Sequence, residues 1–308
     1  MNKRAQRKHH NGWAWALAGI AALGCLTATD AAAQIPIATI EDLQKIGNDP
    51  AYPHDGHYVL IRNIDASATA EWNSGAGFSP IGTSERPFTG VFDGQGHVIT
   101  GLVINRPTTD SVGLFRYVAG DGTIRNLGLE GGTIVGGDYV GGLIGSAYAF
   151  WGTISVSSCW ATGAVTGMDY VGGLIGYARA SSSTISVSSC WATGAVTGSY
   201  AAGGLIGYAY ADSSGDAISV SSCWATGAVT GSYAAGGLIG SAYASSSTIS
   251  VSSCWATGDI SGGVRVGGLI GRNKNGNVTE CYATGRASGS GDHVGGLIGW
   301  NENGNVTE

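Results

Sequence analysis

The chain has 308 residues, of which 54 are glycine, 12% are charged and 43% are hydrophobic, and its formal net charge is −6. Disordered segments are charge-rich and poor in apolar residues, so the composition excludes a disordered chain. Glycine costs about 1 kcal/mol at each position inside a helix, so the composition also excludes a mainly helical protein. The acidic balance argues against a nucleic-acid partner. These observations leave an apolar, turn-rich chain.

The first 33 residues have the order of a secretory signal peptide. A basic start at residues 3–8 precedes an apolar stretch at 13–26 and three alanines at 31–33. The apolar stretch is shorter than the roughly 20 residues that a membrane span needs. We therefore expect cleavage after residue 33, export, and no membrane span in the mature chain. A lipoprotein signal ending at Cys25 is the alternative, although the preceding residues match its usual pattern poorly.

Residues 34–111 are expected to start the fold with a cap and the first coils. Thr39 and Asp42 have the spacing of a capping box ahead of one or two helical turns. Ile40, Leu43 and Ile46 would then cover the open end of the first coil. A solenoid needs such a cap because an open strand edge invites pairing with other chains.

Residues 112–308 consist of repeats of 28–33 residues. The sequence GGLIG starts at six positions: Gly141, Gly172, Gly203, Gly236, Gly267 and Gly295. Four of these copies are followed by ISVSSCWATG and a fifth by NVTECYATG. Self-similarity at this period is typical of solenoids.

Each repeat is rich in β-branched and aromatic residues and is cut by glycine every few residues. This composition predicts two or three short strands per repeat, and we expect Ala/Ser/Tyr-rich stretches such as residues 178–183 to be loops. No segment suits a crossover helix, so stacked copies must pair in parallel, about 4.8 Å apart. The sequence therefore predicts an all-β, right-handed parallel β-helix with a short N-terminal helical cap, since parallel connections are right-handed by default.

The pattern GGLIG followed by CWATG or CYATG resembles the GLUG motif repeat of bacterial surface and secreted proteins, over residues 112–308. The resemblance implies an exported β-helical protein, often large and adhesin-like. GLUG repeats also occur beside the catalytic domain of streptococcal immunoglobulin-A metallopeptidases. The zinc motif of that domain is missing from this sequence, so the peptidase activity is not implied.

The short repeat indicates which side chains face inward. Strict alternation from Val278 would bury Glu280, which is costly without a partner, so we expect a bend at residues 279–280. Two ladders follow from this bend. The internal ladder is Cys159, Cys190, Cys223, Cys254 and Cys281, and the external ladder is Trp160, Trp191, Trp224, Trp255 and Tyr282.

The two ladders suggest different roles. In-register stacking points the cysteine Cβ atoms in one direction, which favours small buried hydrophobes over disulfides, while a zinc site needs tetrahedral ligands. Exposed aromatic rows can stack on sugar rings or on a partner protein, so the tryptophan ladder is the candidate binding surface. The alternative is that each tryptophan packs against the loop of its own repeat.

The sequence contains few residues in the patterns that catalysis or metal binding requires. The motifs HExxH, GxSxG and CxxC do not occur, and Asp138 and Asp169 form an acidic pair one repeat apart that the next two copies lack. We expect no catalytic residue, no metal and no cofactor. The alternatives are a polysaccharide-degrading β-helix enzyme, or the non-catalytic repeat region of a larger secreted protein such as a surface peptidase.

The last residues, 303–308, repeat residues 275–280 and stop one residue before the next expected cysteine, so we expect a truncation in mid-repeat. The expected protein is secreted or lies at the cell surface, with outer-membrane association as one route. We expect an adhesin-like binding or structural module. Its expected partner is a polysaccharide or a cell-surface protein, and not a nucleic acid.

Overall fold

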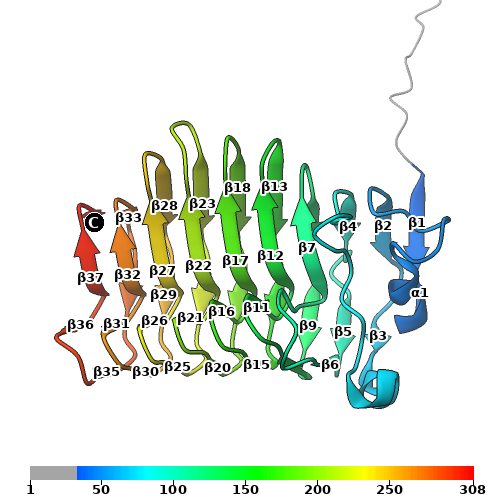
Figure 1. Ribbon diagram of the computed structural model, residues 1–308, viewed down its shortest axis with the longest axis horizontal. Coiled ribbons are helices and arrows are strands. Elements are labelled where there is room, and N and C mark those ends of the chain that lie inside the picture. Colours follow the sequence, from blue (N-terminus) through cyan, green and yellow to red (C-terminus); the bar gives the residue numbers. More distant parts are fainter. Residues whose placement is uncertain (1–32) are drawn as a thin grey trace, which may run out of the picture. The chain divides into compact units, whose positions relative to one another are not determined.

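The chain winds into a stack of coils whose strands pair in parallel with those of the next coil (Figure 1). The computed structural model describes residues 33–308, so the predicted export signal lies outside the described residues except for Ala33. The register follows the repeats, because Ile154 pairs with Ile185 and Trp160 with Trp191. The parallel β-helix is thus confirmed, while its right-handed winding stays a prediction from the rule for parallel connections.

One coil contains five strands, so the prediction of two or three is wrong. A representative coil consists of β12 (Ile144–Ala149), β13 (Thr153–Ser157), β14 (Trp160–Ala161), β15 (Ala164–Thr166) and β16 (Val171–Gly172). Corners at glycine and at left-handed residues divide the chain into pieces as short as two residues. The expected loop at residues 178–183 is also wrong, because residues 178–180 belong to a strand and only 181–183 form the turn.

The strands form five sheets, which we call sheets A to E. Sheet A contains β1 (Gln34–Ile37), β2 (His57–Leu60), β4 (Val91–Asp93), β8 (Thr123–Arg125), β13, β18 (Thr184–Ser188), β23 (Ala217–Ser221), β28 (Thr248–Ser252), β33 (Asn277–Thr279) and β38 (Asn305–Thr307). Sheet B contains β3 (Ile64–Asp65), β5 (Val98–Thr100), β9 (Gly128–Glu130), β14, β19 (Trp191–Ala192), β24 (Trp224–Ala225), β29 (Trp255–Ala256) and β34 (Tyr282–Ala283).

The other three sheets complete each coil. Sheet C contains β6 (Val103–Asn105), β10 (Thr133–Val135), β15, β20 (Val196–Thr197), β25 (Val229–Gly231), β30 (Ile260–Gly262) and β35 (Ala287–Gly289). Sheet D contains β7 (Phe115–Ala119), β12, β17 (Ile175–Ala180), β22 (Ile206–Ala211), β27 (Ile239–Ala244), β32 (Ile270–Lys274) and β37 (Ile298–Glu302). Sheet E contains β11 (Val140–Gly141), β16, β21 (Ala201–Gly203), β26 (Ala234–Gly236), β31 (Arg265–Gly267) and β36 (His293–Gly295).

The corner between sheets A and B uses a residue in the left-handed region. Glu280 has φ 52°, and the equivalent Ser158, Ser189, Ser222 and Ser253 have φ between 51° and 53°. This corner confirms the bend predicted at residues 279–280. It lets Val278 and Val156 on one side, and Cys159 on the other, point inward together.

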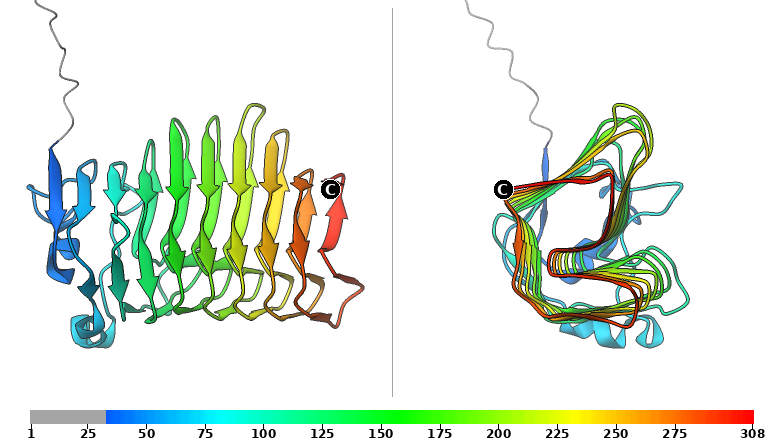
Figure 2. Two further views of the ribbon diagram at one scale, coloured as in Figure 1. Left: turned by 180° about the vertical axis from the view of Figure 1, so that it is seen from behind. Right: turned by 90° about the vertical axis from the view of Figure 1, so that its left-hand side faces the viewer.

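The corner between sheets E and D is made by GGLIG, and there the outline of the coil turns inward (Figure 2, right). A Cβ atom added to Gly203 would overlap the Ile206 carbonyl oxygen of the same coil, and one added to Gly204 would overlap the Gly237 carbonyl oxygen of the next. Only glycine permits this approach. The motif thereby folds the outer surfaces of sheets E and D toward each other.

The N-terminal cap forms as predicted. Helix α1 (Ile40–Lys45) starts at Thr39, whose hydroxyl accepts from the Asp42 N–H at 3.2 Å, while Asp42 accepts from the Thr39 N–H at 3.2 Å. Ile40, Leu43 and Ile46 are buried. A second, 3-10 helix, η1 (Ser67–Gly75), was not predicted. No helix in residues 33–308 has the length and apolar character to cross a bilayer.

Candidate functional site

The tryptophan ladder lies on the outer side of sheet B, where its side chains are half-buried. Ring centroids of successive tryptophans are 4.7, 4.7 and 4.8 Å apart, and their planes are within 4° of parallel. The last ring, Tyr282, lies 6.0 Å from Trp255 and is 53% exposed. At the other end, Trp160 lies over Gly128, where a Cβ would overlap the indole.

This stacking uses the ring faces of the ladder. A sugar ring binds an aromatic side chain through its face, but the faces of Trp191 and Trp224 are covered by the neighbouring indoles. The interior rungs present ring edges to solvent. These side chains lie on the outer side of the coil, as predicted, but in-register stacking occupies their ring faces, which the sequence pattern alone does not reveal.

The cysteine ladder lies inside the coil as a row of free thiols. Among residues 33–308, the four cysteines from Cys159 to Cys254 are buried and Cys281 is partly exposed. The Cys190 N–H donates to the Cys223 sulfur at 3.4 Å, and the Cys190 thiol donates to the Ser188 carbonyl at 3.2 Å. The hydrogen bond with the Cys190 thiol, together with burial, raises the pKa of Cys223 to about 12. The Cys223 thiol therefore stays protonated, and its burial makes it unreactive.

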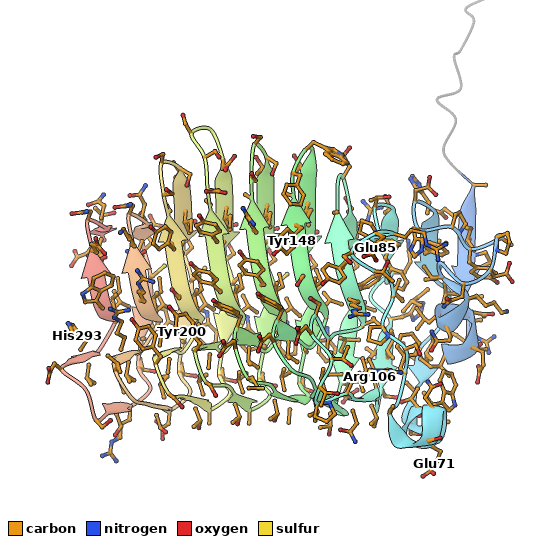
Figure 3. The ribbon with its side chains drawn as sticks, viewed as in Figure 1. Glu71, Glu85, Arg106, Tyr148, Tyr200 and His293 are labelled. Atoms are coloured by element: carbon orange, nitrogen blue, oxygen red, sulfur yellow. The ribbon has the colours of Figure 1, made fainter. Side chains whose placement is uncertain are left out.

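A second set of aromatic residues covers the outer surface of sheets D and E, and the sequence analysis missed it. We call it the aromatic face (Figure 3, where Tyr148 and Tyr200 are labelled). Its tyrosines are Tyr139, Tyr148, Tyr170, Tyr177, Tyr200, Tyr208, Tyr210, Tyr233 and Tyr243. The signal for it was present in β17, where Ala178 and Ala180 point into the coil and alternate with Tyr177 and Arg179 on the outer side. The Tyr177 side chain is nevertheless only 7% exposed, because neighbouring tyrosine rings cover it.

The tyrosines bring sheets D and E together across the inward corner. The ring of Tyr139, which precedes β11, lies 5.2 Å from that of Tyr177 in β17, and Tyr170 lies 5.0 Å from Tyr208 in β22. Tyr177 and Tyr208 stack at 5.6 Å along sheet D. The rings pack over one another in a continuous row, so the glycine corner is filled and the outer edges of the rings form the surface.

Three phenol groups of this face, on Tyr170, Tyr177 and Tyr208, stay protonated over a wide pH range. Burial raises the pKa of Tyr170 to about 12, and it also raises the pKa values of Tyr177 and Tyr208. The Tyr210 hydroxyl donates to Asp212 at 2.9 Å, and Arg265 donates to the Tyr233 hydroxyl. The Tyr148 hydroxyl is also bonded to Arg179, which leaves the hydroxyls of the other tyrosines of the face without a side-chain partner within residues 33–308.

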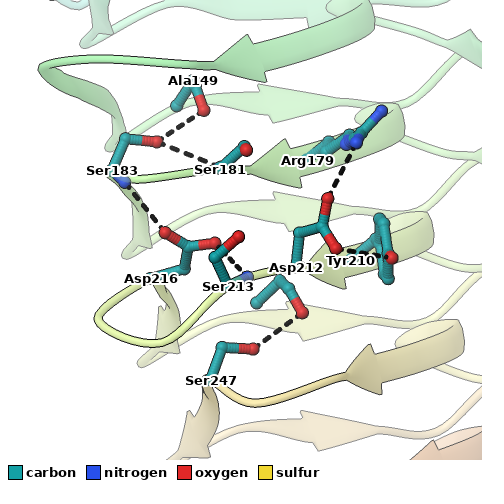
Figure 4. A network of polar contacts seen from close by, with 10 residues as sticks. Ala149, Arg179, Ser181, Ser183, Tyr210, Asp212, Ser213, Asp216 and Ser247 are labelled. Carbon is teal, nitrogen blue, oxygen red and sulfur yellow. Dashed lines mark hydrogen bonds and ion pairs between the residues drawn. The ribbon is translucent and has the colours of Figure 1, made fainter.

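The rim of the face is fixed by a polar network at the turns between sheets D and A (Figure 4). Asp216 accepts from the Ser183 N–H at 3.1 Å and from the Ser213 N–H at 2.6 Å. Arg179 forms an ion pair with Asp212 at 2.9 Å, across neighbouring coils. Because each turn is bonded to the next, the rim holds the ends of the sheet D strands in place.

A hollow of about 560 Å³ lies at the N-terminal end of the aromatic face. Tyr117 and Tyr148 of sheet D form one side, and Glu85 lies on the other (Figure 3). Phe150 and Trp151, in the turn after β12, are 49% and 72% exposed. The equivalent turn of the next coil, at residues 181–183, consists of serines, so these two aromatic side chains are specific to this end of the face.

The acidic pair Asp138 and Asp169 supports the backbone of the corner before sheet E. The Asp138 carboxylate accepts from the Asp169 N–H at 3.2 Å, and Asp110 accepts from the Asp138 N–H at 3.0 Å. Burial and the charge of Asp138 raise the pKa of Asp169. Within residues 33–308, no group of three or more histidine, cysteine or acidic side chains has the arrangement of a metal site.

Comparison with known proteins identifies the repeat. The family model of the GLUG motif matches residues 262–288. The chain carries the GLUG motif. The matched GLUG coil includes β31, β32, β33 and β34, and the earlier copies of GGLIG and CWATG pair with it strand by strand.

Two relatives share part of the repeat region. Halomucin of Haloquadratum walsbyi is 40% identical over 114 residues, which is 36% of this chain and 1% of halomucin. A "Putative Gly-rich membrane protein" of Evansella cellulosilytica is 36% identical over 121 residues, which is 38% of this chain and 14% of that protein. The chain thus spans only a small part of the length of each relative.

A solved structure shares the fold of the GLUG coils. A crystal structure of a "putative immunoglobulin A1 protease" from Bacteroides ovatus superimposes with a TM-score of 0.61 at 20% identity. The match covers 89% of this chain and 84% of the other. At this identity the likeness establishes the β-helix architecture alone.

Proposed function

We propose that this chain is an exported surface module that binds an extended carbohydrate along its aromatic face and has no catalytic activity of its own. The observation that carries the proposal is the row of tyrosine edges along sheets D and E, which ends at an aromatic hollow. Pockets and surfaces that combine aromatic side chains with a few polar groups are typical of ligand sites.

The chemistry of the face suits a hydroxyl-rich polymer. Its phenol groups both donate and accept, as sugar hydroxyls do, and raised pKa values keep those of Tyr170, Tyr177 and Tyr208 protonated. The binding groups recur once per coil, about 4.8 Å apart. A polymer that lies along the coils can therefore contact several of them at once, and many weak contacts add up to useful affinity.

Three observations support an exported, non-catalytic role. The order of residues 1–33 is that of an export signal, and one relative is named as a membrane protein. The acidic pair Asp138 and Asp169 is part of the hydrogen bonding that holds the backbone of the corner. The Asp138 carboxylate accepts from the Asp169 N–H, and the Asp138 N–H donates to Asp110. The free thiols are buried and hydrogen-bonded.

The test is affinity electrophoresis of the purified protein in gels that contain neutral or acidic polysaccharides. The decisive variant is Tyr177→Ser combined with Tyr208→Ser. Serine is native at the paired positions Ser146 and Ser241, so the fold accepts it in this row. We expect the double variant to lose affinity at least tenfold. The control is Tyr282→Ser, at the end of the tryptophan ladder on sheet B, and it should bind like the unchanged protein.

Other outcomes would contradict the proposal. Absence of binding to every polysaccharide, or a loss confined to Tyr282→Ser, would show that the aromatic face is not the binding surface. Incubation with the same polysaccharides tests the non-catalytic part of the proposal. New reducing or unsaturated ends that disappear in Asp169→Asn would show that the protein is an enzyme.

A further inference from the structure

We propose that the aromatic face selects an acidic polysaccharide, whose carboxylate or sulfate groups bind Arg265 and Arg272 at the C-terminal end of the face. This inference rests on the carbohydrate-binding role proposed above and adds the charge class of the ligand. It is carried by the environment of the two guanidinium groups, which differs from that of the neighbouring cations.

Arg265 lies between two aromatic rings along the direction of the coils. Its guanidinium carbon is 4.7 Å from the centre of the Tyr233 ring in the preceding coil and 4.4 Å from that of Trp300 in the following coil. A guanidinium stacked in this way uses its faces for the rings and keeps its N–H groups at the edge. One of these N–H groups donates a hydrogen bond to the Tyr233 hydroxyl, and the other terminal N–H groups are available to a ligand.

Arg272 repeats this arrangement on sheet D. Its guanidinium carbon lies 5.3 Å from the Tyr243 ring and 5.1 Å from the Trp300 ring. Both guanidinium groups therefore lie against the same indole, one from sheet E and one from sheet D. The Nε atoms of both arginines, like that of Arg179, are buried without a hydrogen-bond partner in the described part of the chain, so a ligand would meet the terminal N–H groups.

The nearby cations are neutralised, and these two are not. Arg179 is paired with Asp212 at 2.9 Å, and Lys274 is paired with Glu302 at 3.2 Å. Within residues 33–308, no carboxylate forms an ion pair with Arg265 or Arg272. His293, which pairs with Arg265 in register, adds a third nitrogen-bearing side chain at this end. Two unpaired, preorganised guanidinium groups suit bidentate binding of carboxylate or sulfate oxygens.

A glycan fits these observations better than a nucleic acid. Binding of single strands depends on free aromatic faces for base stacking, and here the ring faces of Tyr233 and Tyr243 are covered by cations. A polysaccharide with widely spaced acidic groups can place one of them at the arginines and its hydroxyls along the tyrosines.

Two matched polymer pairs test the proposal in affinity electrophoresis. Polygalacturonate and its carboxyl-reduced form report on carboxylates, while dextran sulfate and dextran report on sulfate esters. The variant is Arg265→Gln with Arg272→Gln, and the control is Arg62→Gln with Arg286→Gln, which removes the same charge from exposed positions elsewhere. Arg265→Lys keeps the charge without the planar fork, and unchanged thermal unfolding shows that each variant is folded.

We expect at least one acidic polymer to bind at least tenfold more tightly than its neutral partner. This preference should fall at least tenfold in the arginine double variant, fall partly in Arg265→Lys, and persist in the control. The inference would be overturned if neutral and acidic polymers bound equally well and the arginine double variant did not change their binding. The proposed function would then remain intact. Tighter binding of oligodeoxythymidine than of either acidic polymer would also overturn the inference. Failure of every polymer to bind would overturn both proposals.

Discussion

The two glycines that open GGLIG meet different constraints, although they are adjacent. The first, as at Gly203, is confined by the carbonyl oxygen of Ile206 three residues later, so its constraint lies within one coil. The second, as at Gly204, is confined by the carbonyl oxygen of Gly237 in the following coil. Its constraint exists only where another coil is stacked on it, and Gly296 has no atom within 4 Å of an added Cβ.

This difference gives a matched pair of substitutions. Gly204→Ala should lower the free energy of unfolding by about 2–3 kcal/mol, because the new methyl group must displace the backbone of the next coil. Gly296→Ala, at the same place in the motif, should change it by less than about 0.5 kcal/mol. Chemical denaturation of both variants measures the two values. Equal effects would mean that the second glycine is needed for its own backbone conformation and not for coil stacking.

At the scale of the element, the tryptophan ladder stabilises sheet B. Strands β14, β19 and β24 are only two residues long, so they contribute few backbone hydrogen bonds each. The indoles that project from them stack at 4.7 Å and bury one another's faces. Much of the cohesion of this narrow sheet therefore comes from side chains, and an interior rung contributes more than a terminal one.

Removal of an interior ring tests this statement. Trp191→Ala deletes a ring stacked on both sides and should lower the free energy of unfolding by about 2–3 kcal/mol, less than the cost for a fully buried tryptophan. Tyr282→Ala deletes a half-exposed ring with one neighbour at 6.0 Å and should cost under about 1 kcal/mol. Thermal or urea unfolding monitored by far-ultraviolet circular dichroism gives both values. If Trp191→Ala lowered the free energy of unfolding no more than Tyr282→Ala does, interior rungs would not contribute more than terminal ones.

Much of the architecture could be predicted from the repeats, because equivalent residues of an in-register stack adopt the same local structure in every coil. The capping box, the parallel pairing and the bend at Glu280 each follow from a local pattern. The number of strands could not be predicted, since it depends on where corners fall within a coil. The aromatic face was missed for a related reason. Tyr139 precedes β11 and Tyr177 lies in β17 of the next coil, and the GGLIG corner brings their rings to 5.2 Å.

At the scale of the whole solenoid, the coils act as units that interact with their neighbours. Stability of such a stack is close to a sum of coil terms and interface terms, so the loss of one coil should be tolerated. The aromatic face, in contrast, runs along several consecutive coils and becomes shorter when one of them is removed. Stability and binding should therefore respond differently to a change in length.

A deletion of residues 203–235 separates the two properties. It removes one complete coil and joins Ala202 to Gly236, which keeps the register because Gly203 pairs with Gly236. We expect the thermal midpoint to change by about 5 °C or less. Polysaccharide affinity should fall at least tenfold, because Tyr208, Tyr210 and Tyr233 are lost from the face. Unchanged affinity in a folded deletion variant would contradict binding along the face and would favour a role as a spacer.

The row of four indoles on sheet B also has an optical consequence. Parallel chromophores only 4.7–4.8 Å apart share their electronic excitations, so their transitions couple and the absorption of the stack differs from that of four separate indoles. A signal of this kind depends on the spacing and alignment of consecutive coils. It would vanish when the coils separate, even if the individual strands stayed extended. The protein therefore contains its own spectroscopic reporter of the order in which neighbouring coils come apart.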